Sequence, residues 1–231
     1  SKNVGGYYTV KLHKGGWSMI GINWNAADGE GIPLQNLFKH EDLYPGTGAW
    51  DLDNCDQIAL WDNDTQGYVG YFFFKTNELV AAKWYDVGFV ETAAKFLPGT
   101  AFWFHRPSQN GTVSVKLPGM VDGRNNITFT LQQGYSMIAA GYPKERKVGE
   151  LIEGYAGEGE WDFENCDILV VWDNDAKGYR NFYYVDIGEG PQWLDEGFVP
   201  VTQDFLLGQA GWYFRQAETP LVFEEPNPIA E

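Results

Sequence analysis

The stretch that decides the fold is WDLDNCDQIALWDNDTQGY, at residues 50–68, because it occurs twice. At residues 161–179 the chain reads WDFENCDILVVWDNDAKGY, which has the same length and repeats more than half of the residues in the same places. Self-similarity over a long interval is typical of a protein built from repeated structural units. We therefore expect two copies of one module.

Shorter repeats on either side set the limits of the two copies. GWSMI at 16–20 returns as GYSMI at 134–138, and LPGTAFW at 97–103 returns as LLGQAGW at 206–212. Residues 118–126 (PGMVDGRNN) have the Pro, Gly and Asn content of a linker. We expect the first module at residues 1–121 and the second at 122–231, with an extended C-terminal tail. Each is long enough to hold its own core.

The pattern of apolar residues predicts an all-β chain. Apolar residues alternate with polar ones, or gather in short runs between turns, at 7–12, 17–24, 56–61, 68–75, 101–106 and 112–117. The Gly-containing turn at 13–16 predicts a hairpin between the first two strands. Pro33 and the apolar spacing after it predict one short helix per module. These features indicate two tandem homologous antiparallel β-barrel or sandwich modules, and the small number of strands favours a barrel.

The charge of the chain narrows its partners and location. The formal net charge is −16, from 16 Lys and Arg against 32 Asp and Glu. Such a surface repels phosphate backbones and anionic lipids, so we expect neither nucleic-acid binding nor membrane insertion. The chain starts at Ser1 without Met, and no signal peptide is visible in it. We expect a mature secreted protein, located outside the cell or at its surface.

The Asp-rich turns of the repeated stretch are a candidate metal site. Both match D-x-D-x-x-G, which is the opening of a calcium loop, and the candidate ligands are Asp62, Asp64, Asp173 and Asp175. Neither copy has the Glu that closes such a loop at its twelfth position. A plain hairpin turn also favours Asp, Asn and Gly. Both interpretations stay open, so no cofactor is required and Ca²⁺ is the one candidate.

The two cysteines, Cys55 and Cys166, occupy equivalent positions of the two copies. Each is expected to be a small buried apolar residue of its own module. A disulfide between the modules or between neighbouring chains is the alternative, and it requires the two Cα atoms to approach within about 7 Å.

Four tryptophan positions recur as tryptophan. A place in the core of each module explains the recurrence, and an exposed platform for sugar rings is the alternative. The pairs are Trp50 and Trp161, Trp61 and Trp172, Trp84 and Trp193, and Trp103 and Trp212.

Residues suited to catalysis do not recur. His13, His40 and His105 all lie in the first copy, and the second copy has no histidine. The sequence has no Gly-rich phosphate loop, no C-x-x-C motif and no metal-binding histidine spacing. We therefore expect that the protein is not an enzyme.

The order of motifs resembles a repeat of bacterial secreted and surface proteins, in which G-W-N-x-I, D-x-I, a Trp and P-G-x-G-Y-W follow one another. Here the first motif is GWSMI at 16–20 and the last is PGTAFW at 98–103, and the resemblance covers both copies almost from end to end. The second copy departs from it at Leu207, where the Pro is missing. The resemblance implies a location at the cell surface and assigns no activity.

Tandem modules without catalytic residues predict a structural role. We expect a secreted subunit that self-assembles with its own copies into an extracellular filament or surface layer. The terminal segments are the expected docking elements, because a strand can add to a neighbour's open sheet edge. Their apolar residues are Tyr7, Tyr8, Val10, Leu12, Phe223 and Ile229. The alternative function is a carbohydrate-binding protein of the cell envelope that uses exposed Trp and Tyr.

Overall fold

The computed structural model describes residues 4–107, 110–121, 126–150 and 152–227. Module one comprises β1 (Val4–Leu12), β2 (Gly16–Gly21), β3 (Ile32–Pro33), α1 (Leu34–Leu37), η1 (His40–Asp42), β4 (Asp56–Asp62), β5 (Gly67–Phe74), β6 (Lys83–Asp86), β7 (Lys95–Phe96), β8 (Ala101–Arg106) and β9 (Val113–Val121). Module two comprises β10 (Ile127–Leu131), β11 (Gly134–Ala139), β12 (Arg146–Lys147), η2 (Val148–Glu150), β13 (Ile168–Asp173), β14 (Gly178–Asp186), β15 (Pro191–Leu194), β16 (Asp204–Phe205), β17 (Ala210–Arg215) and β18 (Leu221–Glu225).

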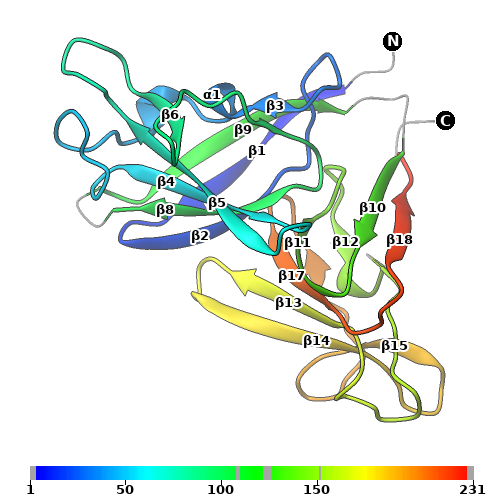
Figure 1. Ribbon diagram of the computed structural model, residues 1–231. Helices are drawn as coiled ribbons and strands as arrows, with labels where there is room; N and C mark the ends of the chain where they lie inside the picture. The colour runs from blue at the N-terminus through cyan, green and yellow to red at the C-terminus, as the bar shows by residue number, and fades with distance from the viewer. Residues whose placement is uncertain (1–3, 108–109, 122–125, 151, 228–231) are drawn as a thin grey trace.

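Both modules have the same topology, which Figure 1 shows in two halves of the molecule. A five-stranded antiparallel sheet has the order β2-β8-β4-β5-β6 in module one and β11-β17-β13-β14-β15 in module two. A two-stranded ribbon accompanies each sheet, β1-β9 or β10-β18, and a second short pair, β3-β7 or β12-β16, completes the module. The prediction of an all-β chain with two homologous antiparallel modules is confirmed.

Three details differ from the expectations. β1 and β2 form no hairpin, because β1 pairs with β9 while β2 pairs with β8. Among the described strands β2 and β6 are the two edges of an open sheet, so each module is a two-layer sandwich and not a closed barrel. The predicted linker begins later, since Pro118 still pairs with Tyr7 inside the β1-β9 ribbon.

The change of layer after β1 has a physical reason. Tyr8, Val10 and Leu12 alternate with exposed residues, and all three pack into the core of module one against the main sheet. A strand that covers a sheet in this way lies in a second layer, so the turn after Leu12 connects two layers. The short helix of module one is α1, and its counterpart in module two is the 3₁₀ helix η2. No helix of the described residues is long and apolar enough to cross a membrane.

The main sheets bury side chains on both faces, as β8 illustrates. Phe102 and Phe104 point into the core of module one, where Trp84 is fully buried. Ala101 and Trp103 alternate with them and belong to a separate apolar cluster, together with residues of module two. Because side chains of a strand alternate between its two faces, the face opposite the core is available for contact between the modules.

A buried ion pair joins the same two positions in each module. Arg106 Nη1 lies 3.1 Å from Asp56 Oδ2, and Arg215 Nη1 lies 2.5 Å from Asp167 Oδ2. Both carboxylates are fully buried, and Asp56 Oδ2 also accepts a hydrogen bond from the Tyr44 amide. Burial raises the pKa of Asp56 to about 6, and the nearby Arg106 guanidinium opposes this shift. The Asp of the repeated N-C-D motif is therefore a structural residue.

Replacing Arg106 should show how much the buried ion pair contributes to stability. We expect Arg106→Ala to lower the free energy of unfolding by about 3–5 kcal/mol, because it leaves a buried carboxylate without its partner. Without Arg106 the pKa of Asp56 rises further. At low pH Asp56 therefore binds a proton, and the variant no longer holds an unpaired buried charge. The loss, measured by urea unfolding, should therefore be larger at about pH 8 than at about pH 5. A loss that is equal at both values would contradict the account.

Candidate functional site

The outer faces of the two main sheets meet in an apolar cluster. Its buried members are Met19, Ala101 and Trp103 from module one and Met137, Ala139 and Ala210 from module two. Trp61, Trp172 and Trp212 pack against them. All of these residues except Ala139, whose repeat equivalent is Gly21, have their equivalent in the same cluster, so the contact has approximate two-fold symmetry. Figure 1 shows the β13–β14 hairpin of module two lying below β2 of module one.

An asparagine from each Asp-rich turn binds the edge strand of the other module. Asn174 Oδ1 accepts a hydrogen bond from the Met19 amide at 2.8 Å, and Asn174 Nδ2 donates to the Met19 carbonyl at 2.8 Å. In the opposite direction, Asn63 Oδ1 accepts from the Met137 amide at 3.1 Å. Met19 lies on β2 and Met137 on β11, which are edge strands of their sheets. The amide side chains thus satisfy backbone groups that an edge strand leaves unpaired. We call these contacts the asparagine clasp.

Further contacts reinforce the clasp beside Asn63. Gln66 Nε2 donates to the Tyr135 carbonyl at 2.8 Å, and Gln66 Oε1 accepts from the Tyr135 amide at 3.3 Å. Trp61 Nε1 donates to the same carbonyl at 3.1 Å. Asn63 and Gln66, to which the sequence analysis assigned no role, therefore help to hold the modules together. The only sequence signal for this role was the recurrence of Asn63 as Asn174 in the second copy.

Two glycines allow the modules to approach closely. The Gly21 amide donates to the Gly208 carbonyl at 2.8 Å, and the equivalent Ala139 amide donates to the Gly99 carbonyl at 3.2 Å. Gly99 and Gly208 have φ values of 87° and 75°, which suit glycine. A Cβ atom at Gly208 would lie 2.6 Å from the Tyr8 ring, so a side chain there would separate the modules.

The candidate calcium ligands make other contacts. Asp62 Oδ1 accepts hydrogen bonds from the Asp64 and Thr65 amides, both at 2.9 Å, as expected of a capped turn. Asp173 Oδ1 does the same for two amides of its own turn. Asp175 Oδ1 lies 2.9 Å from Lys11 Nζ, which holds the pKa of that carboxyl below its usual range. Within the described ranges no group of three or more His, Cys, Asp or Glu side chains could hold a metal ion. Calcium binding stays a prediction.

Both cysteines are fully buried, in separate apolar clusters of their own modules. Cys55 packs with Phe74 and Tyr85, and Cys166 packs with Val185 and Leu194. Burial raises the pKa of the Cys55 thiol to about 12 and that of Cys166 to about 11. The thiols are free, and the structure does not bring them together. It favours their interpretation as core residues.

The residues expected to dock on neighbouring chains lie mostly within the modules. Tyr8, Val10 and Leu12 are buried in the core of module one because β1 covers its own sheet. Tyr7 is exposed, with Lys116 Nζ 4.2 Å from its ring centroid. Phe223 stacks on Phe129 with centroids 4.7 Å apart, inside the β10-β18 ribbon. Ile229 lies outside the described residues.

The recurring tryptophans occupy three different environments. Trp84 and Trp193 lie in the module cores, as expected. Trp61, Trp103, Trp172 and Trp212 line the contact between the modules. Trp50 and Trp161 are exposed by 51% and 53%, so the core interpretation is wrong for them. The sequence could not separate these cases, because strand alternation places an aromatic residue on a face without saying what covers that face.

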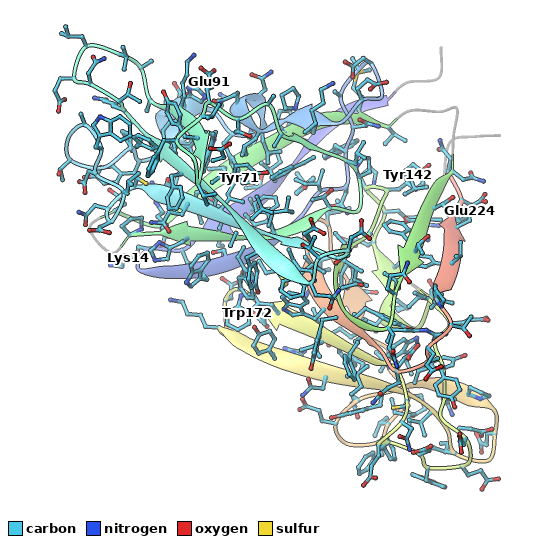
Figure 2. The ribbon with its side chains drawn as sticks, viewed as in Figure 1. Lys14, Tyr71, Glu91, Tyr142, Trp172 and Glu224 are labelled. Carbon is cyan, nitrogen blue, oxygen red and sulfur yellow. The ribbon has the colours of Figure 1, made fainter. Side chains whose placement is uncertain are left out.

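Two equivalent cavities open beside the apolar cluster. One, of about 600 Å³, is lined by Trp17, Ala59, Tyr68, Trp103, Trp172 and Tyr179. The other, of about 380 Å³, is lined by Tyr135, Val170, Tyr179, Trp212, Trp61 and Tyr68. Each lining residue of the first is matched by its repeat equivalent in the second. We call them the Trp17 cavity and the Tyr135 cavity, and together the aromatic groove. In Figure 2, Trp172 lies where the β13–β14 hairpin faces module one.

The walls of the aromatic groove are fixed by contacts between the modules. Trp103 and Trp172 meet edge to face with centroids 5.2 Å apart, and Trp61 and Trp212 do so at 5.1 Å. Such pairs hold their rings in defined orientations. The aromatic surface of the groove is therefore preformed.

The other rings of the groove remain accessible. Trp17 is exposed by 41%, and the exposed fractions of Tyr68, Tyr135 and Tyr179 are 55%, 50% and 50%. Partial burial raises the pKa of the Tyr68 and Tyr179 phenols, against hydrogen bonds with Trp103 and Trp212. Both phenols are therefore neutral at physiological pH, and the groove presents hydroxyl groups between flat apolar rings.

Comparison with known proteins found no matching family model, no matching curated protein and no matching solved structure. The function is therefore argued from the geometry of the chain itself. That the protein is not an enzyme stays a prediction.

The asparagine clasp can be tested within a single turn. We expect Asn63→Ala to lower the free energy of unfolding by about 1 kcal/mol, because the Met137 amide loses its acceptor. Hydrogen exchange of that amide should become faster while amides of the module cores keep their protection. Asp64→Ala is the matched control, since this neighbouring carboxylate is exposed and the described residues give it no hydrogen bond or ion pair across the interface. Equal exchange at Met137 in the two variants would show that the clasp has no energetic role.

Proposed function

We propose that this protein binds neutral glycans in the aromatic groove. The observation that carries the proposal is the gathering of exposed tryptophan and tyrosine rings in two equivalent cavities. In soluble proteins, contiguous exposed apolar surface of this kind marks a site of interaction. The volumes of about 600 and 380 Å³ lie in the range of small-ligand pockets.

The chemistry of the groove matches a sugar ring. The face of a pyranose carries C–H bonds, whose slightly positive hydrogens suit the negative face of an aromatic ring. Its edge carries hydroxyl groups, which can exchange hydrogen bonds with the phenols of Tyr68 and Tyr179. A preformed site also avoids the entropic cost of ordering its side chains when the ligand binds.

Charge narrows the class of ligand. None of the residues that line the two cavities is charged. The whole chain carries a formal net charge of −16, which repels polyanions such as sulfated glycans and nucleic acids. A neutral glycan meets no such repulsion. The expected location outside the cell or at its surface accords with a ligand of this kind.

Replacing the most exposed tryptophan of the groove should test the proposal. We expect Trp17→Ala to weaken binding of the best ligand at least about tenfold, or about 1.4 kcal/mol, because the Trp17 cavity loses its outer wall. The measurement is isothermal titration with cellohexaose, xylohexaose and mannohexaose. The fold should persist, since Trp17 lies outside the module cores.

Trp50→Ala is the matched control for this experiment. Trp50 is about as exposed as the rings of the groove but lies in the loop before β4, and it lines neither cavity. We expect unchanged affinity for this variant. Loss of binding with Trp50→Ala but not with Trp17→Ala would contradict the proposed site.

Self-assembly is a second candidate function, and exposed aromatic residues at the far ends of the modules favour it. Trp50 and Phe89 have φ values of 60° and 61°, and the equivalent Trp161 and Phe198 both have 62°. Bulky residues rarely adopt this left-handed conformation, which stores strain of about 1–3 kcal/mol. All four are about half exposed. The loops that carry them lie at opposite ends of the molecule (Figure 1), as end-to-end association requires.

Glycine substitutions can test this second candidate without disturbing the backbone. Phe89→Gly and Phe198→Gly remove exposed rings at positions whose φ suits glycine. If the protein assembles end to end, negative-stain microscopy and sedimentation velocity should show filaments or oligomers of the unmodified chain, and the double variant should be monomeric. An unmodified chain that remains monomeric at every concentration tested would contradict self-assembly.

A further inference from the structure

The two cavities of the aromatic groove occupy equivalent positions of the repeat but differ in chemistry. Ala59 in the Trp17 cavity corresponds to Val170 in the Tyr135 cavity, and Trp17 corresponds to Tyr135. The first cavity therefore combines the larger aromatic platform with the smaller aliphatic residue. The Trp17 cavity is also the larger of the two, with a volume of about 600 Å³ against about 380 Å³ for the Tyr135 cavity.

The strand residues next to the two cavities also differ in size and polarity. Ala59 pairs with Gly70 across β4 and β5, and a Cβ atom at Gly70 would lie 3.4 Å from a methyl group of Val87. In module two Val170 pairs with Asn181, whose amide side chain donates to Glu196 Oε1 at 2.8 Å. An apolar surface without side-chain bulk thus adjoins the Trp17 cavity, and a polar pair adjoins the Tyr135 cavity.

The cavities are neighbours and not independent sites. Both are lined by Tyr68 and Tyr179, one from each module. A chain that leaves one cavity past these two rings enters the other.

We propose that one neutral glycan chain spans both cavities, with the Trp17 cavity as its main subsite and the Ala59/Val170 difference setting its direction. The inference rests on the proposed function. A two-fold symmetric groove would accept a directional chain equally well in either orientation. The difference between Ala59 and Val170 makes the two orientations unequal, because only the Trp17 cavity has room for the bulkier end of the glycan chain.

Chain length and two reciprocal substitutions test the proposal by isothermal titration. For the wild-type protein, affinity should rise from the disaccharide to the hexasaccharide of the cello-, xylo- or mannooligosaccharide series that binds best. We expect Ala59→Val to weaken hexasaccharide binding about tenfold, because two methyl groups enter the main subsite. Val170→Ala enlarges the other cavity and should therefore strengthen hexasaccharide binding. Val170→Ala alone keeps the test decisive if Ala59→Val does not fold.

A nitroxide at the reducing end of the hexasaccharide reports chain direction. In the wild-type protein it should broaden the NMR signals of one cavity only, either those of Trp17 or those of Tyr135. In the double variant Ala59→Val/Val170→Ala, the broadening should move to the other cavity. Equal broadening of both cavities in the wild-type protein would overturn the inference about direction.

The remaining outcomes separate the inference from the proposed function. If the wild-type protein binds no glycan, or binds a proline decapeptide in their place, the proposed function fails and the inference with it. If it binds glycans with an affinity that is the same for disaccharide and hexasaccharide, the proposed function stands and the two-subsite inference fails. Equal losses for Ala59→Val and Val170→Ala would also overturn the inference.

Discussion

The structure depends on the asparagine clasp, in which a side-chain amide from each module takes the place of a neighbouring strand. An edge strand exposes backbone groups that can pair with another chain. Here Asn174 satisfies Met19 on β2, while Asn63 and Gln66 satisfy the equivalent edge β11. The clasp therefore closes one edge of each main sheet and fixes the angle between the modules at the same time.

The aromatic groove is a consequence of this arrangement. A strand such as β8 presents Phe102 and Phe104 to its own core and Trp103 to the other module. Because the modules contact each other through their sheet faces, rings that would be exposed in an isolated module become the walls of a shared cavity. The proposed ligand site thus belongs to neither module alone, although every residue in it has a repeat equivalent in the other module.

The repeat made much of the fold predictable. Alternation and turn residues located β4, β5 and β8 closely, because each buries one face in a regular way. The hairpin expected between β1 and β2 was wrong, since a Gly-containing turn serves equally to connect two layers and to connect two paired strands. The preference for a barrel was wrong for a related reason. Closure depends on how the edge strands meet, and local pattern does not report that.

The site itself was only partly predictable. The Asp and Asn of the repeated turns indicated either a plain turn or calcium, and nothing local to them indicates that Asn63 reaches a strand of the other module. The core interpretation of the recurring tryptophans holds for Trp84 and Trp193, but the sequence could not distinguish core from interface for the others. That distinction arises from contacts between residues far apart in the chain, such as Trp103 with Trp172.

The indole N–H signals of the ten tryptophans test the central claim most directly. Five of them line the aromatic groove, at Trp17, Trp61, Trp103, Trp172 and Trp212, and five lie elsewhere, at Trp24, Trp50, Trp84, Trp161 and Trp193. In a two-dimensional NMR titration with the best-binding hexasaccharide, the account predicts shifts confined to the first group. Shifts confined to the second group, or centred on Trp50 and Trp161, would contradict it.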